Sequence, residues 1–326
     1  MEPAVMLRAV RKTFGKTTAV ESMTLEIPRG GLYGFIGPSG AGKTTCIRMI
    51  MSILFPDSGT LSVLGHASAL EAKDRIGYLP EERGVYRKMK VGAFLTYMAR
   101  LKGVSAADAE TRVPGLLEAV GLPGTATKRC DDMSKGMLQR VQFVAAIVHQ
   151  PELIILDEPF TGLDPLSVRL LRELIVAEHR RGATILFSTH VMSNAEEICE
   201  HIVMIHQGRK VLDGPMAGLR RQFDAHTILF EPLALDADPA PIRALGGVEH
   251  VEKTGDGYRI ALSPAADPAS VMRAIVAAIP PARIELARLR LEDVFIRIVT
   301  GGGGTGTAAH ALRAGLRMPD TEGTLV

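Results

Sequence analysis

Short apolar segments separated by turn residues fill the first part of the chain. Most are too short for a helix and are bounded by Gly, Pro, Ser or Asp, a pattern typical of β-strands. One of them, Leu32–Ile36, holds only apolar residues and glycine, as a strand buried on both faces does. The predicted strands of this region are Met6–Arg11, Val20–Ile27, Leu32–Ile36, Thr60–Leu64 and Ile76–Leu79.

Between residues 90 and 150 the apolar residues recur at every third or fourth position, which is the period of an amphipathic helix. The predicted helices are Val91–Leu101, Ala106–Val120 and Met137–His149. We therefore expect a helical subdomain over about 88–150.

Strands and helices alternate beyond residue 150. Two short apolar runs, Leu153–Leu156 and Thr184–Phe187, flank a helix predicted at Pro165–Arg180, and a hairpin is predicted to turn at Gln207-Gly208. This alternation predicts an α/β fold with buried parallel strands at its centre. We expect one domain over 1–220.

A shift in composition after residue 220 marks a second domain, predicted at 221–300. Its order of elements, β-α-β-β-α-β, is that of the split βαβ, ferredoxin-like arrangement. No titratable side chains cluster there, so we interpret it as a small α+β accessory domain. Residues 301–326 begin with four consecutive glycines and predict a disordered tail. The predicted elements are His226–Glu231, Pro241–Leu245, Val248–Lys253, Tyr258–Leu262, Ala269–Ile279, Ile284–Arg290 and Leu291–Val299.

Composition narrows the class of protein. The net charge of +2 and the absence of Trp give little support for nucleic-acid binding, so no nucleic-acid partner is expected. The three cysteines form no C-x-x-C pair, which favours a reducing compartment. The beginning of the chain shows no signal-peptide pattern, and no apolar run approaches the roughly 18 residues of a membrane span.

The segment Gly37–Thr44 reads GPSGAGKT and fits the P-loop pattern G-x-x-x-x-G-K-[ST]. A predicted strand precedes it and a helix-like segment, Thr45–Met51, follows, which favours a phosphate site over a chance glycine-rich turn. Lys43 is placed to reach the β- and γ-phosphates, and Thr44 offers its hydroxyl to Mg²⁺. The residues predicted to hold the nucleotide here are Gly37, Pro38, Ser39, Gly40, Ala41, Gly42, Lys43, Thr44 and Thr45.

Two acidic residues follow the buried strand Leu153–Leu156. Asp157 and Glu158 therefore lie at the carboxyl edge of the predicted sheet, where open α/β folds bind ligands. We predict that Asp157 holds Mg²⁺ and that Glu158 acts as general base on the attacking water. An ordinary acidic turn is the alternative, and the P-loop upstream favours the functional interpretation.

With these motifs, residues 4–220 resemble the ATP-binding subunit of ABC transporters. Met133–Met137 (MSKGM) stands at the signature position of that family, and Gly162–Asp164 is similar to its D-loop. The resemblance implies a P-loop NTPase of the ABC ATPase type, with an antiparallel β subdomain beside the helical one. It also implies a head-to-tail homodimer with ATP between the P-loop of one copy and the signature of the other. The resemblance adds Phe14 as an adenine-stacking ring, Glu81 near Mg²⁺, Ser134, Gly136 and Asp164 near the nucleotide, and His190 as a catalytic γ-phosphate sensor.

Two motifs depart from the family pattern. The signature keeps Ser134 and Gly136, and hence a hydroxyl and backbone N–H groups at a helix N-terminus, but has Lys135 and Met137 for Gly and Gln. Glu81 stands where glutamine is usual, so it brings a carboxylate that can ligate Mg²⁺. A solvated Lys135 and a solvent-facing Glu81 are the alternatives.

Two further segments, Pro80–Gly84 (PEERG) and Leu291–Phe295 (LEDVF), resemble those of a subgroup of exporter ATPases. They imply an ATPase that powers a separate transmembrane permease. It would dock through the region 88–130 and lie in the cytoplasm on the inner face of the membrane.

Two other functions compete with this interpretation. A soluble ABC-type ATPase acting on the ribosome or DNA usually carries two cassettes, long coiled coils or strongly basic segments, and the sequence shows none. A regulatory nucleotide-binding module would not need Lys43, Asp157, Glu158 and His190 together. The transported substrate is not encoded in these motifs.

Overall fold

The structure is a computed structural model, and it describes residues 2–82, 84–222, 227–234, 236–287 and 290–299. Contacts divide the chain into two compact units. Among the described residues, the first unit holds those up to Met216 together with 295–299, and the second unit holds those of Ala217–Val294. The predicted tail, 301–326, lies outside the described residues. The domain limits drawn from the sequence stay predictions.

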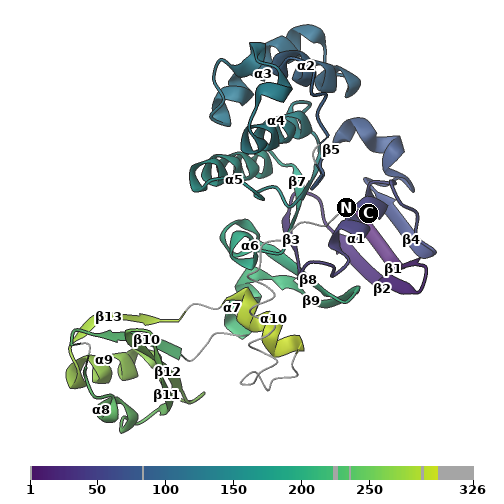
Figure 1. Ribbon diagram of the computed structural model, residues 1–326. Helices are drawn as coiled ribbons and strands as arrows, with labels where there is room; N and C mark the ends of the chain where they lie inside the picture. Colours follow the sequence, from purple (N-terminus) through teal and green to yellow (C-terminus); the bar gives the residue numbers. More distant parts are fainter. Residues whose placement is uncertain (1, 83, 223–226, 235, 288–289, 300–326) are drawn as a thin grey trace. The chain divides into compact units, whose positions relative to one another are not determined.

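A six-stranded sheet forms the centre of the first unit (Figure 1). Its strands are β3 Leu32–Ile36, β5 Ile76–Leu79, β6 Leu153–Asp157, β7 Thr184–Thr189, β8 His201–His206 and β9 Arg209–Pro215. The order is β5-β6-β7-β3-β8-β9, parallel throughout except that β9 runs antiparallel to β8. Strands β3, β6 and β7 are buried along their whole length, which accounts for their unbroken apolar runs.

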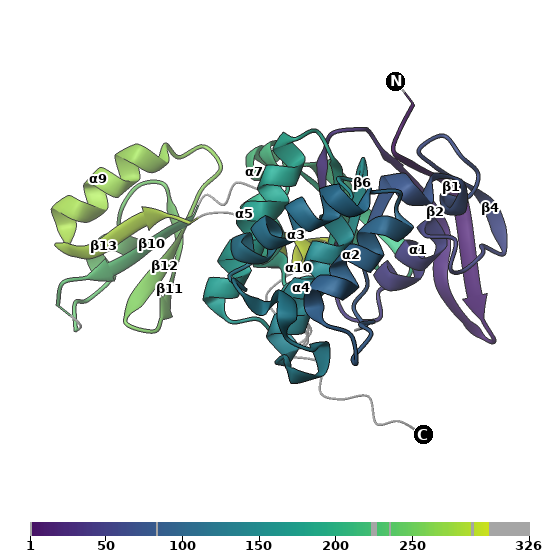
Figure 2. The ribbon, with the colours of Figure 1, turned by 90° about the horizontal axis from the view of Figure 1, so that it is seen from above.

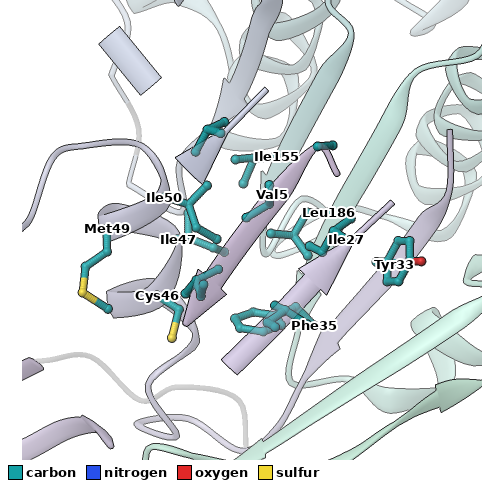
Figure 3. Close-up of a cluster of buried hydrophobic side chains, with 14 of the residues drawn as sticks. Val5, Ile27, Tyr33, Phe35, Cys46, Ile47, Met49, Ile50, Ile155 and Leu186 are labelled. Carbon is teal, nitrogen blue, oxygen red and sulfur yellow. The ribbon is translucent and has the colours of Figure 1, made fainter. Parts of the chain in front are cut away.

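An antiparallel sheet of three strands makes up the predicted β subdomain. Its order is β2-β1-β4, with β1 Val5–Phe14, β2 Thr17–Ile27 and β4 Ser58–Val63. Helix α1, Lys43–Ile50, contacts this sheet and also β6. Figure 3 shows the shared core, in which Ile47 of α1 lies near Val5 of the small sheet and near the central sheet, represented by Ile155 and Leu186.

The helical subdomain consists of α2 Val91–Leu101, α3 Ala106–Ala119 and α4 Lys135–Ile147, which pack against one another (Figure 2). Short 3₁₀ turns at Thr125–Thr127 and Cys130–Asp132 connect α3 to α4. Helix α4 also contacts β5. The segment Met133–Met137 therefore leads into a helix that packs against the central sheet.

Three further helices cover or follow the central sheet. These are α5 Pro165–Arg180, α6 Met192–Ile198 and α7 Met216–Gln222. Helix α5 contacts β7, and α6 contacts β3 and β7. A 3₁₀ segment, Ala69–Arg75, leads into β5. None of the helices in the described part of the chain is long and apolar enough to cross a membrane.

The second unit contains an antiparallel sheet of four strands. Its order is β11-β12-β10-β13, so the first and third strands of the unit form the centre, as the β-α-β-β-α-β order predicts. Phe230, Ile260 and Ile275 lie in its core. The elements are β10 Thr227–Pro232, α8 Ala240–Arg243, β11 Val248–Thr254, β12 Gly257–Leu262, α9 Pro268–Ala278 and β13 Pro281–Leu286. Helix α10, Leu291–Val299, follows.

Several boundaries differ from the sequence prediction. The strand predicted at Ile284–Arg290 is wrong in position, because β13 begins at Pro281, where a proline is tolerated at the first residue of an edge strand. Helix α4 begins two residues before Met137, since Ser134 caps it and accepts a hydrogen bond from Met137 N. Helix α6 was not predicted, because seven residues without a side-chain cap leave a weak pattern.

All three cysteines, Cys46, Cys130 and Cys199, carry free thiols and are buried. Burial raises the pKa of the Cys46 thiol to about 12 and also raises the pKa of the other two thiols. These side chains therefore serve packing, with Cys46 in α1 directly behind the P-loop.

Candidate active site

The P-loop connects the end of β3 to the start of α1, and its glycines are needed for different reasons. A Cβ on Gly37 would stand 2.2 Å from Ile205 O, and one on Gly42 would stand 2.4 Å from Ala19 O. Gly40 has open space around it but adopts a φ of 74°. Two glycines therefore allow close backbone packing, and the third allows a left-handed turn.

Lys43 is buried and folds back over the loop that precedes it. Its Nζ donates hydrogen bonds to Gly37 O at 2.8 Å and to Pro38 O at 3.2 Å. Because a buried ammonium needs such partners, the two carbonyls fix the charge inside the loop, where the pattern predicts phosphate.

Asp157 ends β6 and is fully buried. Ser188 Oγ donates to Asp157 Oδ1 at 2.8 Å, whereas Oδ2 accepts no hydrogen bond from any residue that the structure describes. Burial raises the pKa of this carboxyl, and the nearby hydroxyls of Ser188 and Thr44 oppose the rise. A buried oxygen without a partner beside the Thr44 hydroxyl suits a hard cation such as Mg²⁺.

Glu158 is held by the end of the neighbouring strand. Its Oε1 accepts a hydrogen bond from His190 N at 2.8 Å and lies 2.8 Å from His190 Nδ1, while Thr189 Oγ1 donates to Oε2 at 3.2 Å. Glu158 is buried and has a φ of 49°, a left-handed conformation that non-glycine residues seldom adopt. Such strain is common at functional sites and here turns the carboxylate toward His190.

Ser188 and Thr189 are site residues that the sequence analysis missed. They end β7, which pairs in parallel with β6 so that Ser188 lies opposite Asp157. The signal was present in the sequence, because two hydroxyl residues follow the apolar run Thr184–Phe187 at the same sheet edge. They hold the two carboxylates on which the predicted chemistry depends.

The signature and D-loop residues form a second group. Ser134 Oγ accepts a hydrogen bond from Met137 N at 3.2 Å, and a Cβ on Gly136 would lie 3.4 Å from Leu163 Cδ2. Asp164 caps α5 by accepting hydrogen bonds from Ser167, which lower the pKa of its carboxyl. Among the described hydrogen bonds, those of Ser134 and Asp164 stay within their own helix caps.

The other predicted residues lie around the P-loop. Phe14 ends β1 and is 47% exposed, and Lys12 Nζ lies 5.6 Å from the centroid of its ring. Glu81 is exposed and follows β5, which pairs in parallel with β6, so it lies at the sheet edge that carries Asp157. Ser39 is exposed, and Thr44 and Thr45 stand in the first turn of α1.

Comparison with known proteins identifies the family. A model of the family described as ABC transporter matches residues 20–161. The ABC transporter ATP-binding protein YhaQ of Bacillus subtilis (strain 168) is 36% identical over 290 residues, which cover 89% of this chain and 96% of that protein. This chain belongs to the ATP-binding proteins of ABC transporters. Members of this family couple ATP hydrolysis to transport, so the predicted family, fold class and ATPase activity are confirmed.

Further comparisons cover both units of this ABC ATP-binding protein. A model described as the C-terminal domain of DrrA1-3-like ATP-binding proteins matches residues 214–299. The Nod factor export ATP-binding protein I of Paraburkholderia xenovorans (strain LB400) is 35% identical over 262 residues, 78% of this chain and 84% of that protein. A solved structure titled "Structure of ATP binding subunit of ABC transporter" shares 32% identity with a TM-score of 0.63, and the match covers 68% of this chain and 93% of that chain.

Proposed function

We propose that this chain is the subunit that hydrolyses Mg-ATP to drive export through a separate membrane permease, at the inner face of the cell membrane. The observation that carries the proposal is the pairing of Glu158 with His190 beside Asp157 and a P-loop that encloses Lys43. Export is supported by the similarity to the Nod factor export ATP-binding protein I.

The donor set fits a magnesium ion. Asp157 Oδ2 is buried and has no hydrogen-bond partner among the described residues, and the Thr44 hydroxyl interacts with the same carboxyl group. Magnesium would neutralise charge on the phosphates when it is bound. Removal of Mg²⁺ by a chelator is therefore expected to stop ATP hydrolysis by the purified chain, and an unchanged rate would contradict the assigned site.

Glu158 is the residue placed to take a proton from water. With Oε1 engaged by His190 and Oε2 by Thr189, the carboxylate is fixed in one orientation before substrate arrives. When His190 donates from Nδ1, its ring is held against Glu158, and we expect this ring to approach the γ-phosphate of bound ATP. The pair therefore aligns the general base and links it to the phosphate that is cleaved.

We also propose that two copies close head to tail on ATP. The N-terminus of α4, with the Ser134 hydroxyl and the Gly136 backbone, offers hydrogen-bond donors to the nucleotide of the other copy. Asp164 fixes the start of α5, and Leu163 lies beside Gly136. This arrangement holds the D-loop and the signature segment as one surface.

The permease is proposed to dock on the helical subdomain. A groove of about 670 Å³ lies between α2 and α3. Exposed apolar side chains, Tyr97 and Leu101, line it, and Tyr86 packs edge-on against Tyr97 with ring centroids 5.8 Å apart. Because exposed apolar patches of this kind mark interaction surfaces, we assign the groove to a cytoplasmic segment of the permease.

Replacing Tyr97 with glutamate is expected to release the permease without changing ATP hydrolysis by the isolated chain. The carboxylate would have to be buried in the interface, which is costly without a partner. Co-purification of the tagged chain with its permease from detergent-solubilised membranes measures the effect. Leu233→Glu is the matched control, since Leu233 is exposed in the second unit. Full retention of the permease by Tyr97→Glu would place the docking surface elsewhere.

Replacing Glu81 with glutamine is expected to raise the Mg²⁺ concentration needed for half-maximal ATP hydrolysis by several-fold, with little change in ATP affinity. Hard cations favour a carboxylate over an amide, and Glu81 lies at the sheet edge that carries Asp157. Magnesium titrations of both proteins at saturating ATP measure the shift. Superimposable curves would mean that only the backbone at this position matters.

A further inference from the structure

The turn between β8 and β9 lies directly behind the P-loop. Ile205 O fills the space that a Cβ on Gly37 would need, and Gly208 N donates to Ala41 O at 2.9 Å. The Cα of Gly208 also lies 3.5 Å from the position of a Cβ on Gly42. The β8–β9 turn therefore packs against three residues of the P-loop backbone, Gly37, Ala41 and Gly42.

His206 ends β8 at this turn, and Phe295 of α10 packs against it. The two ring centroids are 5.4 Å apart and the planes meet at 76°, which is an edge-to-face contact. Phe295 is fully buried, and His206 Nδ1 is a buried atom without a hydrogen-bond partner among the described residues. Burial lowers the pKa of His206, so the ring that meets Phe295 is neutral near pH 7.

Helix α10 belongs to both units. Its first residues, Leu291–Val294, are part of the second unit, whereas its remaining residues, 295–299, are part of the first. The chain leaves the second unit through α10. At Phe295 it contacts His206, which stands at the β8–β9 turn behind the P-loop.

We propose that His206 is a positioning residue for ATP binding, because Phe295 seated against it holds the β8–β9 turn in the place that shapes the P-loop. The inference rests on the proposed ATP site and adds a role for the second unit. Anything that displaces α10 removes the packing against His206, and the backbone N–H groups that receive the phosphates then lose their support. The accessory domain thereby sets nucleotide affinity through α10.

The position of this contact predicts that nucleotide affinity changes and that the catalytic rate does not. The turn supports Gly37, whose carbonyl accepts a hydrogen bond from Lys43, so loss of the contact loosens the phosphate cradle. Glu158 and His190 stand at the ends of β6 and β7 and are held by each other. The dissociation constants of ATP and ADP are therefore expected to rise, while kcat at saturating ATP stays largely unchanged.

The test compares His206→Ala, Phe295→Ala and the double variant in the full chain. Each single change is expected to raise the Kd of ATP and ADP by about threefold to tenfold, the range for loss of one aromatic pair. The double variant should bind no more weakly than the weaker single variant, because both changes remove the same contact. His206→Phe keeps an aromatic edge against Phe295 and should preserve the wild-type Kd.

A matched control separates positioning from stability. Phe94→Ala removes another fully buried ring, in the helical subdomain, and should lower the melting temperature without changing the Kd of ATP. If Phe295→Ala does not fold, Phe295→Leu and His206→Ala decide the matter. Unchanged Kd values in the folded variants, or additive effects in the double variant, would overturn the inference. Absence of ATP binding by the wild type would instead contradict the proposed function.

Discussion

Replacing Lys43 with alanine is expected to abolish ATP turnover and to weaken ATP binding. Two backbone carbonyls fix the Lys43 ammonium inside the phosphate loop, and the alanine side chain carries no charge to take its place. Loss of a cation that stabilises charge in phosphoryl transfer lowers the rate by about 10³-fold or more. Steady-state phosphate release by the purified chain, with ATP and Mg²⁺, measures the loss.

Two other lysine variants sharpen this experiment. Lys43→Arg keeps the charge, but the planar guanidinium does not fit the space in which Nζ meets Gly37 O and Pro38 O, so activity is expected to stay low. Lys253→Ala changes an exposed lysine of the second unit and should leave the rate unchanged. Hydrolysis by Lys43→Ala within a few-fold of the wild type would remove the basis for placing the phosphates at this loop.

Replacing Glu158 with glutamine is expected to preserve ATP binding and to halt hydrolysis, so that an ATP-bound dimer accumulates. The amide oxygen can still accept the hydrogen bond from His190 N, and the amide nitrogen can donate to Thr189 Oγ1, so the fold around the site is kept. The amide cannot take a proton from water, and loss of a general base costs about 10²-fold to 10⁴-fold in rate.

Light scattering coupled to size exclusion measures the accumulation of the ATP-bound dimer. With ATP, the Glu158→Gln variant should elute at twice the mass found without nucleotide. Glu173→Gln is the control, since Glu173 is an exposed residue on α5 that pairs only with Arg169 among the described ion pairs. Turnover at the wild-type rate by Glu158→Gln would assign the base to another residue, and a mass independent of ATP would argue against the head-to-tail dimer.

Much of the fold around the nucleotide is predictable because its signals are local. The apolar run Leu153–Leu156 predicts β6. The proline at the first position of α5 marks the start of that helix, which was predicted at Pro165–Arg180 and has these bounds in the structure. The P-loop pattern likewise specifies a strand, a turn and a helix in sequence. Each of these features depends on neighbours in the chain, so spacing alone carries the information.

Other features depend on contacts between distant segments. The hydrogen bond from Ser188 to Asp157 requires the parallel register of β6 and β7, which the sequence pattern of either strand does not contain. The packing of Phe295 on His206 joins two residues that are separated in the sequence by the whole of the second unit. The same limit explains β13, where a proline that usually ends a strand begins one at a sheet edge.

The burial of all three thiols has a practical consequence for measuring motion in this protein. Cys46, Cys130 and Cys199 are enclosed, and burial keeps their pKa values raised, so little reactive thiolate is present at neutral pH. Maleimide dyes or spin labels added to the native protein will therefore react first with a cysteine introduced at an exposed position. Distance measurements between labelled copies need no prior removal of the natural cysteines, including the one that packs behind the phosphate loop.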